Sequence, residues 1–179
     1  MKILDFGCGN NKYLPKNKSD KVIGMDIAKL PGVDLVHDLE RFPWPFKKNE
    51  FDMVVSNHVL EHMSNLVKVM EELWRISKPG AIIKINVPYF ASPGAFQDPT
   101  HKRFFTLKTF EYFTEKSGLN YYSTARFEIL KRKITSFVTR PEISKILDPF
   151  INGWPRFYER FLSRIIAADN LYVELKVIK

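Results

Sequence analysis

The sequence predicts an α/β fold built around a doubly wound, mostly parallel sheet. Five short apolar segments occur in the first 90 residues, and the first two end at a glycine or an aspartate. They are apolar along most of their length, which is typical of strands covered on both faces. Turns or helical stretches separate them, as the crossovers of a parallel sheet require.

The five predicted strands follow one another closely along the chain. The start of the fifth is set by the turn Lys78-Pro79-Gly80, because glycine and proline both favour turn geometry. The predicted ranges are 2–6, 21–25, 33–37, 51–56 and 81–87.

Two helices are predicted, and one crossover helix is not. Ser64 is placed to cap the first helix, whose apolar residues recur at helical spacing until Pro79 ends it. The segment between the first two strands is short and contains Pro15, so we expect no full crossover helix there. The second helix covers about 107–117 and stops at Gly118. Its predicted buried residues are Leu107, Phe110 and Phe113.

The last third of the chain completes a single domain that spans residues 1–179. Two further strands are predicted at about 122–133 and 171–178. They bracket an aromatic segment, and we expect residues 134–168 to form a helical insertion or lid between them.

Residues 150–166 predict a basic amphipathic helix. Arg156, Arg160 and Arg164 recur every four residues on one face, and an apolar stripe follows another. Such a helix either lies on an anionic membrane or closes over an apolar substrate, or it packs its stripe against the sheet. The stripe consists of Trp154, Phe157, Phe161, Leu162 and Ile165.

The composition and the charge of the chain narrow its expected cellular location and the kinds of partner it could bind. Of the net charge of +8, most belongs to residues 101–179, which carry 15 Lys or Arg against 8 Asp or Glu. An anionic substrate, a nucleic acid or a lipid headgroup would be drawn to this half. A single cysteine permits no internal disulfide, no signal peptide is recognisable, and no stretch approaches the about 20 apolar residues of a membrane span. We expect a cytoplasmic protein, with contact to a membrane surface as one option.

The first strand runs into a glycine turn that is shaped to approach a ligand. Asp5, Gly7 and Gly9 lie at the carboxyl end of this strand, where open parallel sheets bind their ligands. A dinucleotide site would place a third glycine where Lys12 stands, so the phosphate interpretation is weak. Asp26 closes the second strand, where a carboxylate can accept hydrogen bonds from both hydroxyls of a ribose.

The third predicted strand adds an adenine site. Asp38 follows it and can accept a hydrogen bond from an adenine amino group, while Leu39 lies on the ring. Successive strands that end in Asp or Gly would therefore line an adenosine without needing a phosphate. Carboxylates in this arrangement would also favour a positively charged nucleoside.

Five segments in this order and spacing resemble the successive motifs of class I S-adenosylmethionine-dependent methyltransferases, most closely the branch that acts on small molecules, lipids and glycans. The resemblance covers residues 2 to about 118. It implies a seven-stranded sheet whose last strand, 171–178, is antiparallel, and S-adenosylmethionine as the cofactor. The segments are DFGCG (5–9), Asp26, VHDLERFPWPF (36–46), FDMVVSNHVLEHM (51–63) and LWRISKPGAIIKINVPY (73–89).

The same resemblance implies roles for individual residues. Gly7 and Gly9 would pack on the methionine part, Asp26 would hold the ribose, and Asp38 with Leu39 would hold the adenine. Asn57 and His58 would lie beside the methyl donor. Many relatives carry helices before the first strand that cover the cofactor, so in this chain we expect the lid to come from residues 134–168.

Two further motifs admit competing interpretations. HVLEH (58–62) spells the H-x-x-E-H signature of certain zinc peptidases. It follows a strand of a nucleotide-type sheet rather than lying within a long helix, so we expect no metal there and a structural or cofactor-edge role instead. NVPY (86–89) is similar to a box of DNA methyltransferases that belongs after the fourth strand, whereas this one follows the fifth. Tyr89 is then either an aromatic wall near the methyl group or part of the core.

The loop after the fifth strand carries the candidate acceptor residues. His101 could take a proton from the acceptor, a role worth about 10² to 10⁴ in rate, and His58 is a second catalytic candidate. Alternatively, Asp98 fixes the turn and His101 caps it. Lys102 and Arg103 could clamp an anionic substrate.

The predicted function is methyl transfer from S-adenosylmethionine to a small, anionic or lipid-linked acceptor. One alternative is a non-catalytic module that binds a nucleotide or a membrane surface. Another is an RNA methyltransferase, although no RNA-binding motif is recognisable and we do not expect a nucleic-acid partner. The oligomeric state does not follow from the sequence.

Overall fold

The protein is built on one seven-stranded sheet with the strand order β3-β2-β1-β4-β5-β7-β6. The computed structural model describes the backbone of residues 1–179 and every side chain except that of Asn120. Strands β1 to β5 are parallel, and β7 is antiparallel to both of its neighbours, β5 and β6. This confirms the predicted doubly wound fold. The strands are β1 (Lys2–Phe6), β2 (Lys21–Asp26), β3 (Leu35–Val36), β4 (Phe51–Asn57), β5 (Ser77–Pro88), β6 (Arg126–Thr135) and β7 (Asn170–Ile178).

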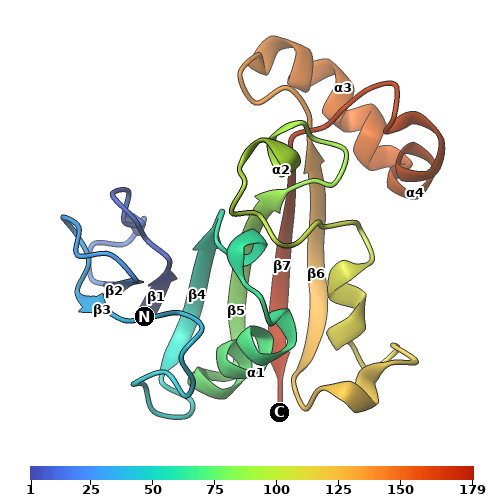
Figure 1. Cartoon of the computed structure of the whole chain (residues 1–179). Helices are drawn as coiled ribbons and strands as arrows, with labels where there is room; N and C mark the ends of the chain where they lie inside the picture. Colours follow the sequence, from blue (N-terminus) through green and yellow to red (C-terminus); the bar gives the residue numbers. More distant parts are fainter.

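The helices are few and mostly short. Helix α1 covers one face of the sheet, whereas α3 and α4 lie beyond the carboxyl ends of β5 and β6 (Figure 1). The α-helices are α1 (Leu66–Ile76), α2 (Gly94–Gln97), α3 (Pro141–Gly153) and α4 (Pro155–Phe157). Single turns of other helix types are η1 (Leu60–His62), η2 (Thr109–Phe113), η3 (Asn120–Tyr122) and the π-helical η4 (Tyr158–Leu162).

Helix α1 forms for the reason that the sequence indicated, but with a different cap. Its apolar residues repeat at helical spacing and bury one face against the sheet. Asn65, not Ser64, is the cap, because the Asn65 side chain accepts a hydrogen bond from the amide of Lys68 at 3.0 Å. The Ser64 hydroxyl instead donates to Glu40. The buried residues of α1 are Val69, Met70, Glu72, Leu73 and Ile76.

Strands β3 and β5 depart from their predicted limits. β3 has only two residues, because the Asp34 carboxylate accepts a 2.7 Å hydrogen bond from the amide of Gly24 that the ladder would otherwise use. β5 begins at Ser77, four residues before its predicted start, and so runs through the expected turn at Pro79 and Gly80. Gly80 has φ +76°, and the pairing with β4 shifts register at this point, as at a bulge.

The helix predicted over 107–117 is wrong in type and length. Only the 3₁₀ segment η2 forms, although Leu107, Phe110 and Phe113 are buried as predicted. The Thr114 hydroxyl donates to the Glu111 carbonyl at 2.8 Å, so a side chain occupies the acceptor that a continuing helix would need. The next strand, β6, begins at Arg126 rather than 122, because η3 occupies 120–122.

No helix forms between β1 and β2 in the described backbone, as predicted. Side chains hold this crossover instead. The Asp5 carboxylate accepts a hydrogen bond from the amide of Tyr13 at 2.6 Å, and Lys12 pairs with Asp34. The segment therefore stays close to the end of β1 without a helix of its own.

The insertion between β6 and β7 is helical but broken. α3 ends at Gly153, Trp154 leaves the helical region at φ −132° and ψ 60°, and Pro155 starts α4. The single amphipathic helix predicted over 150–166 is therefore wrong: proline cannot donate the backbone bond that would join the pieces. None of the helices described for this chain is long and apolar enough to span a bilayer.

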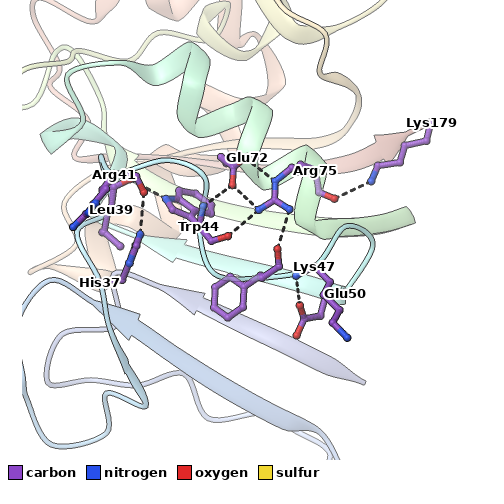
Figure 2. Close-up of polar contacts among 10 residues, drawn as sticks. His37, Leu39, Arg41, Trp44, Lys47, Glu50, Glu72, Arg75 and Lys179 are labelled. Carbon is purple, nitrogen blue, oxygen red and sulfur yellow. Dashed lines mark hydrogen bonds and ion pairs between the residues drawn. The ribbon is translucent and has the colours of Figure 1, made fainter.

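A buried polar network fixes the segment that follows β3. Glu72 of α1 accepts a 3.0 Å hydrogen bond from the amide of Trp44, and Arg75 donates to the carbonyls of Trp44 and Phe46 at 3.0 and 2.9 Å (Figure 2). The Trp44 ring also donates to the carbonyl of Leu39 at 3.0 Å. An ion pair on α1 thus sets the course of the chain around Leu39.

Candidate functional site

The glycine turn after β1 is bent back and tied to β2. Gly7 and Gly9 have φ of +69° and +51°, a left-handed conformation that glycine adopts without steric cost. The amides of Gly7 and Cys8 both donate to the carbonyl of Met25, at 2.8 and 3.2 Å. A Cβ on Gly7 would lie 2.4 Å from Val59, whereas a Cβ on Gly9 would meet nothing within 4 Å. Gly7 therefore faces the protein, and Gly9 faces open space.

Two carboxylates brace this turn. Asp26 accepts hydrogen bonds from the amides of Gly9 and Ala28, at 2.8 and 3.0 Å, one on each oxygen. A carboxylate offers about four lone-pair sites, so capacity remains for two hydroxyls. Asp5 is 4% exposed, and burial raises its pKa, with the Asp26 charge acting in the same direction. Its observed role is to hold the Tyr13 amide, and direct cofactor contact by Asp5 stays a prediction.

The two residues predicted to bind adenine after the third strand, Asp38 and Leu39, differ in exposure. The register sets Asp26 opposite Val36, so Asp38 lies two residues further along the neighbouring strand and is exposed. Its carboxylate accepts a hydrogen bond from the Glu40 amide at 3.0 Å, which leaves the other oxygen open. Leu39 is only 6% exposed and belongs to the core, so little of its side chain can reach a purine.

The ends of β4 and β5 bring together a polar group that extends this edge. Asn57 pairs in register with Asn86, and the Asn86 amide donates to the Asn57 oxygen at 2.9 Å and lies 3.3 Å from His58 Nε2. His58 adopts φ +54°, a conformation uncommon outside glycine, and its Nδ1 lies 3.2 Å from Glu61. Sequence reasoning missed Asn86, although its place at the end of the strand beside Asn57 was a usable signal.

A second polar group, also missed as a group, lies around His62 and His101. The two rings are 4.8 Å apart at 69°, and the His101 ring is only 9% exposed. Thr100 bridges His62 Nδ1 at 2.9 Å and Asp98 at 2.6 Å. The Thr100 hydroxyl holds the pKa of the Asp98 carboxyl below its usual range, so this group is an anion at neutral pH. The H-x-x-E-H signature was the available signal for Glu61 and His62.

These features fit S-adenosylmethionine. The bare Gly9 surface admits a ligand against the backbone, Asp26 can accept from a ribose, and the strand order reverses beside β1 as in other nucleotide-binding sheets. Residues 4–85 match the family model described as a methyltransferase domain. This match, together with the fold, supports the class I S-adenosylmethionine-dependent methyltransferase family. S-Adenosylmethionine is accordingly the cofactor that this edge of the sheet accommodates.

Two curated proteins resemble the chain over part of their length. A tRNA (carboxymethyluridine(34)-5-O)-methyltransferase of Arabidopsis thaliana is 37% identical over 95 residues, which are 48% of this chain and 23% of that protein. A mitochondrial arginine hydroxylase of Homo sapiens is 34% identical over 92 residues, 44% of this chain and 26% of that one. The chain thus spans about a quarter of the length of these curated relatives.

Solved methyltransferase-family structures share the whole fold. A SAM-dependent methyltransferase from Archaeoglobus fulgidus superposes with a TM-score of 0.64 at 19% identity, covering 98% of this chain and 85% of that one. At this identity the likeness concerns the fold alone. It extends over the insertion and β7, which the family model does not reach.

The methyltransferase fold buries Tyr89, which corrects its prediction as a substrate wall. Tyr89 is 0% exposed, and its hydroxyl donates to Glu159 at 3.0 Å. Its ring packs against Phe90 and Tyr158. Burial, followed by the Glu159 charge, raises the pKa of Tyr89 well above its ordinary value. Tyr89 therefore belongs to the core, the alternative that the sequence left open.

The side chains of Lys102 and Arg103 make contacts within the protein. Lys102 donates to the Ser64 hydroxyl at 2.8 Å and pairs with Glu40 at 3.3 Å. Arg103 donates to the carbonyls of Met63 and Ser64. These bonds fasten the loop of residues 98–103 to the connection between η1 and α1. Both side chains are exposed, and their role as an anion clamp stays a prediction.

Proposed function

We propose that the chain transfers a methyl group from S-adenosylmethionine to an oxygen, nitrogen or carbon of a small, anionic or lipid-linked acceptor. One observation carries the proposal. The bare glycine turn with Asp26 and the basic, apolar insertion lie at the same edge of the sheet, at the carboxyl ends of its parallel strands (Figure 1).

Methyl transfer requires little of the protein beyond the placement of the methyl donor and the acceptor. S-Adenosylmethionine held beside Gly9 and Asp26 would supply an activated methyl group to the acceptor atom and would be released as S-adenosylhomocysteine, and a proton on the acceptor would pass to a base or to water. Holding both partners in line can contribute about 7 to 11 kcal/mol. His101 and His58 stay the candidate bases. His58 Nε2 lies 3.3 Å from the Asn86 amide at the end of β5, and His101 Nδ1 lies 3.1 Å from the Ala95 carbonyl.

The surface of the insertion supports an apolar partner. Trp154, Phe161 and Ile165 are 64%, 57% and 80% exposed, so these residues of the predicted stripe do not pack on the sheet, whereas Leu162 packs against the core. Ring contacts join Phe150 to Trp154 at 5.7 Å and Phe157 to Phe161 at 5.2 Å, so the exposed residues are grouped. Contiguous exposed apolar side chains mark sites of interaction. We call the exposed apolar and basic residues of 140–165 the insertion surface. Its apolar members are Ile146, Phe150, Trp154, Phe157, Phe161 and Ile165.

Most charges of the insertion are sorted by sign. Glu159 accepts hydrogen bonds from Tyr89 and from the amide of Leu107, and Asp148 accepts two from Ser136, so these two acids face inward. Glu142 is the exposed acid of the insertion. The basic residues are exposed, and Arg160 lies 5.8 Å from the Phe161 ring. The exposed basic residues are Arg140, Lys145, Arg156, Arg160 and Arg164.

An anionic membrane is the partner that best fits an apolar group ringed by positive charge. Aromatic side chains can enter the headgroup region, while each nearby Lys or Arg contributes about 1 kcal/mol of attraction to anionic lipid. A lipid-linked acceptor would then be presented beside the cofactor edge. A peptide partner would need acidic residues that match these basic side chains. It is the alternative that remains if the second test below rejects the membrane.

The first test measures cofactor binding by thermal melting with S-adenosylhomocysteine and, separately, NAD. At about 100 times its dissociation constant, a ligand stabilises the folded chain by about 2.7 kcal/mol. We expect this for S-adenosylhomocysteine alone and its loss in Asp26→Ala, because that carboxylate braces the turn at Gly9. Stabilisation by NAD of equal size would contradict the assignment.

The second test measures sedimentation with phosphatidylglycerol and phosphatidylcholine vesicles. We expect binding to the anionic vesicles only, a loss of at least 10-fold in R160E/R164E, and a comparable loss in W154S/F161S. The matched control is K47E/K48E, which changes the net charge equally in the turn before β4. Equal loss in both charge pairs would show unspecific attraction, and no binding by the wild type would reject the membrane.

RNA methylation is a second candidate, favoured by the tRNA methyltransferase among the relatives and by the basic second half. It predicts tRNA affinity that falls steeply with salt, with a log–log slope of several units. A non-catalytic module would instead bind S-adenosylhomocysteine and transfer no methyl group to lipid, glycan or RNA fractions. Radiolabelled methyl transfer to these fractions separates the three functions.

A further inference from the structure

Glu61 is a buried acid without sufficient partners. Its side chain is 1% exposed, and no hydrogen bond reaches its Oε2 among the described residues. Oε1 has one contact, the 3.2 Å approach of His58 Nδ1. Burying a carboxylate costs several kcal/mol unless a cation or hydrogen-bond donors compensate it. The position therefore calls for a positive partner near Oε2.

The fold directs two histidines to this carboxylate. One ligand atom from each of Glu61, His62 and His101 lies within 4.8 Å of the others. The cause is local: the amides of Lys102 and Arg103 both donate to the Glu61 carbonyl, at 2.7 and 3.1 Å, which brings the loop that carries His101 against η1.

The hydrogen bonds leave Nε2 of both histidines without a proton. His101 Nδ1 lies 3.1 Å from the Ala95 carbonyl, so Nδ1 carries the hydrogen. The Thr100 hydroxyl gives its only hydrogen to Asp98 and must accept from His62 Nδ1. In both neutral rings, Nε2 is therefore a bare lone pair, the form that binds metals.

His58 completes the arrangement from outside. The Asn86 amide donates toward His58 Nε2, so His58 Nδ1 carries the hydrogen and faces Glu61 Oε1. This leaves Glu61 Oε2 for another partner. All three ligands thus have their second polar atom held by a neighbour, the outer-shell pattern that orients ligands in metal sites.

We propose that Glu61, His62 and His101 bind a divalent transition-metal ion. Two imidazoles and one carboxylate suit zinc, manganese, iron or cobalt rather than calcium. The expectation of no metal concerned the H-x-x-E-H signature, in which His58 and His62 would be the ligands, and it rested on the position of that signature after a strand. The structure separates this pair, because η1 is a single 3₁₀ turn and His58 lies at φ +54°.

The proposal stands independently of methyl transfer, and it bears on His101. A bound ion would occupy the Nε2 lone pair, so the roles of metal ligand and general base exclude each other. Asp98 Oδ2, 3.8 Å from His101 Nε2, would add negative charge beside the ion.

The experiment is calorimetric titration of the tag-free chain with zinc, together with cobalt absorption in the visible range. We expect one ion per chain, cobalt bands of a site with nitrogen and oxygen ligands, and binding abolished in Glu61→Gln and in His101→Ala. His58→Ala should weaken affinity about 10- to 100-fold, because it removes only an outer partner. His37→Ala is the matched control and should bind normally, since His37 lies outside the cluster.

Folding and cofactor binding are measured on the same variants. His101→Ala alters a loop side chain, so its circular dichroism and its stabilisation by S-adenosylhomocysteine should match the wild type even where Glu61→Gln unfolds. Absence of zinc binding in the wild type would overturn the proposal, as would unchanged affinity in folded His101→Ala. Loss of S-adenosylhomocysteine binding in the wild type would instead reject the proposed function and leave the metal result intact.

Discussion

Replacement of Gly7 by alanine should destabilise the fold more than any other single-methyl change at the glycine turn. The added Cβ would lie 2.4 and 2.7 Å from the two methyl carbons of Val59, distances that real contacts do not reach. Gly7 also has φ +69°, a conformation that L-residues adopt only at a cost. Two separate penalties therefore act on one substitution.

The size of each penalty follows from the geometry. The left-handed conformation costs a non-glycine residue about 1 to 2 kcal/mol. Forcing a methyl group into a packed core costs about 1 to 3 kcal/mol, and Val59 is only 5% exposed, so it has little room to move. We expect Gly7→Ala to lower the free energy of unfolding by about 2 to 5 kcal/mol, measured by urea denaturation.

Three variants separate the causes. Gly9→Ala has the same backbone cost but no clash, so it should lose about 1 to 2 kcal/mol of stability while its Cβ blocks the cofactor side. Gly118→Ala has neither problem and should stay within about 0.5 kcal/mol of the wild type. In Gly7→Ala/Val59→Ala, the two effects should be less than additive by about 1 kcal/mol or more. Strict additivity, or equal losses at Gly7 and Gly118, would refute the reasoning.

Three further predictions concern the polar contacts around the sheet. Asp52 accepts hydrogen bonds from the Lys2 amide and from Lys78, which hold its pKa below the ordinary 3.8, so Asp52→Asn should destabilise at pH 7. That difference should vanish as the pH falls through the lowered pKa of the folded state, because the wild-type carboxyl is then protonated as well, and urea melts at a series of pH values measure it. Arg75→Met should lower the free energy of unfolding by about 3 kcal/mol, because it leaves Glu72 buried without its cation. We expect the double variant Glu72→Met/Arg75→Met to recover stability. An unchanged melting point in the single variant would contradict the role of the network. Tyr89→Phe should cost about 1.5 to 3 kcal/mol through the lost bond to the Glu159 carboxylate, with cofactor binding unchanged; a loss of cofactor binding without a loss of stability would restore Tyr89 to the site.

The fold was predictable because its main signals are local. Buried parallel strands need continuous apolar runs, and the first two runs here are closed by Gly7 and by Asp26. The direction of β7 came from the family resemblance rather than from its own residues. Its alternation of buried and half-buried positions fits either direction.

Element ends were less predictable because single side chains decide them. Asp34 shortens β3 by accepting the Gly24 amide, and Thr114 stops η2 by bonding a nearby carbonyl. Ser64 and Asn65 are both good caps by residue type, and only the distant Glu40 determines which is used. Such choices depend on partners that the sequence does not place.

The residues of the candidate site also divide into those that local sequence predicts and those that depend on distant partners. The glycines and Asp26 are set by backbone geometry at strand ends, which sequence spacing records. Lys102, Arg103 and Tyr89 look alike as ligand residues and as structural residues until their partners are known. The cluster of Glu61, His62 and His101 depends on a loop docking across about 40 residues, a contact that no local pattern encodes.

The bonds of the glycine turn to β2 have a consequence for the energetics of ligand capture. Because the amides of Gly7, Cys8 and Gly9 are already satisfied by Met25 and Asp26, the turn needs no rearrangement when it receives a nucleoside. Little conformational entropy would be lost there, and affinity would reflect contact rather than ordering. Amide hydrogen exchange at these three residues should be slow before and after saturation, so the thermodynamic signature of binding would arise elsewhere in the molecule.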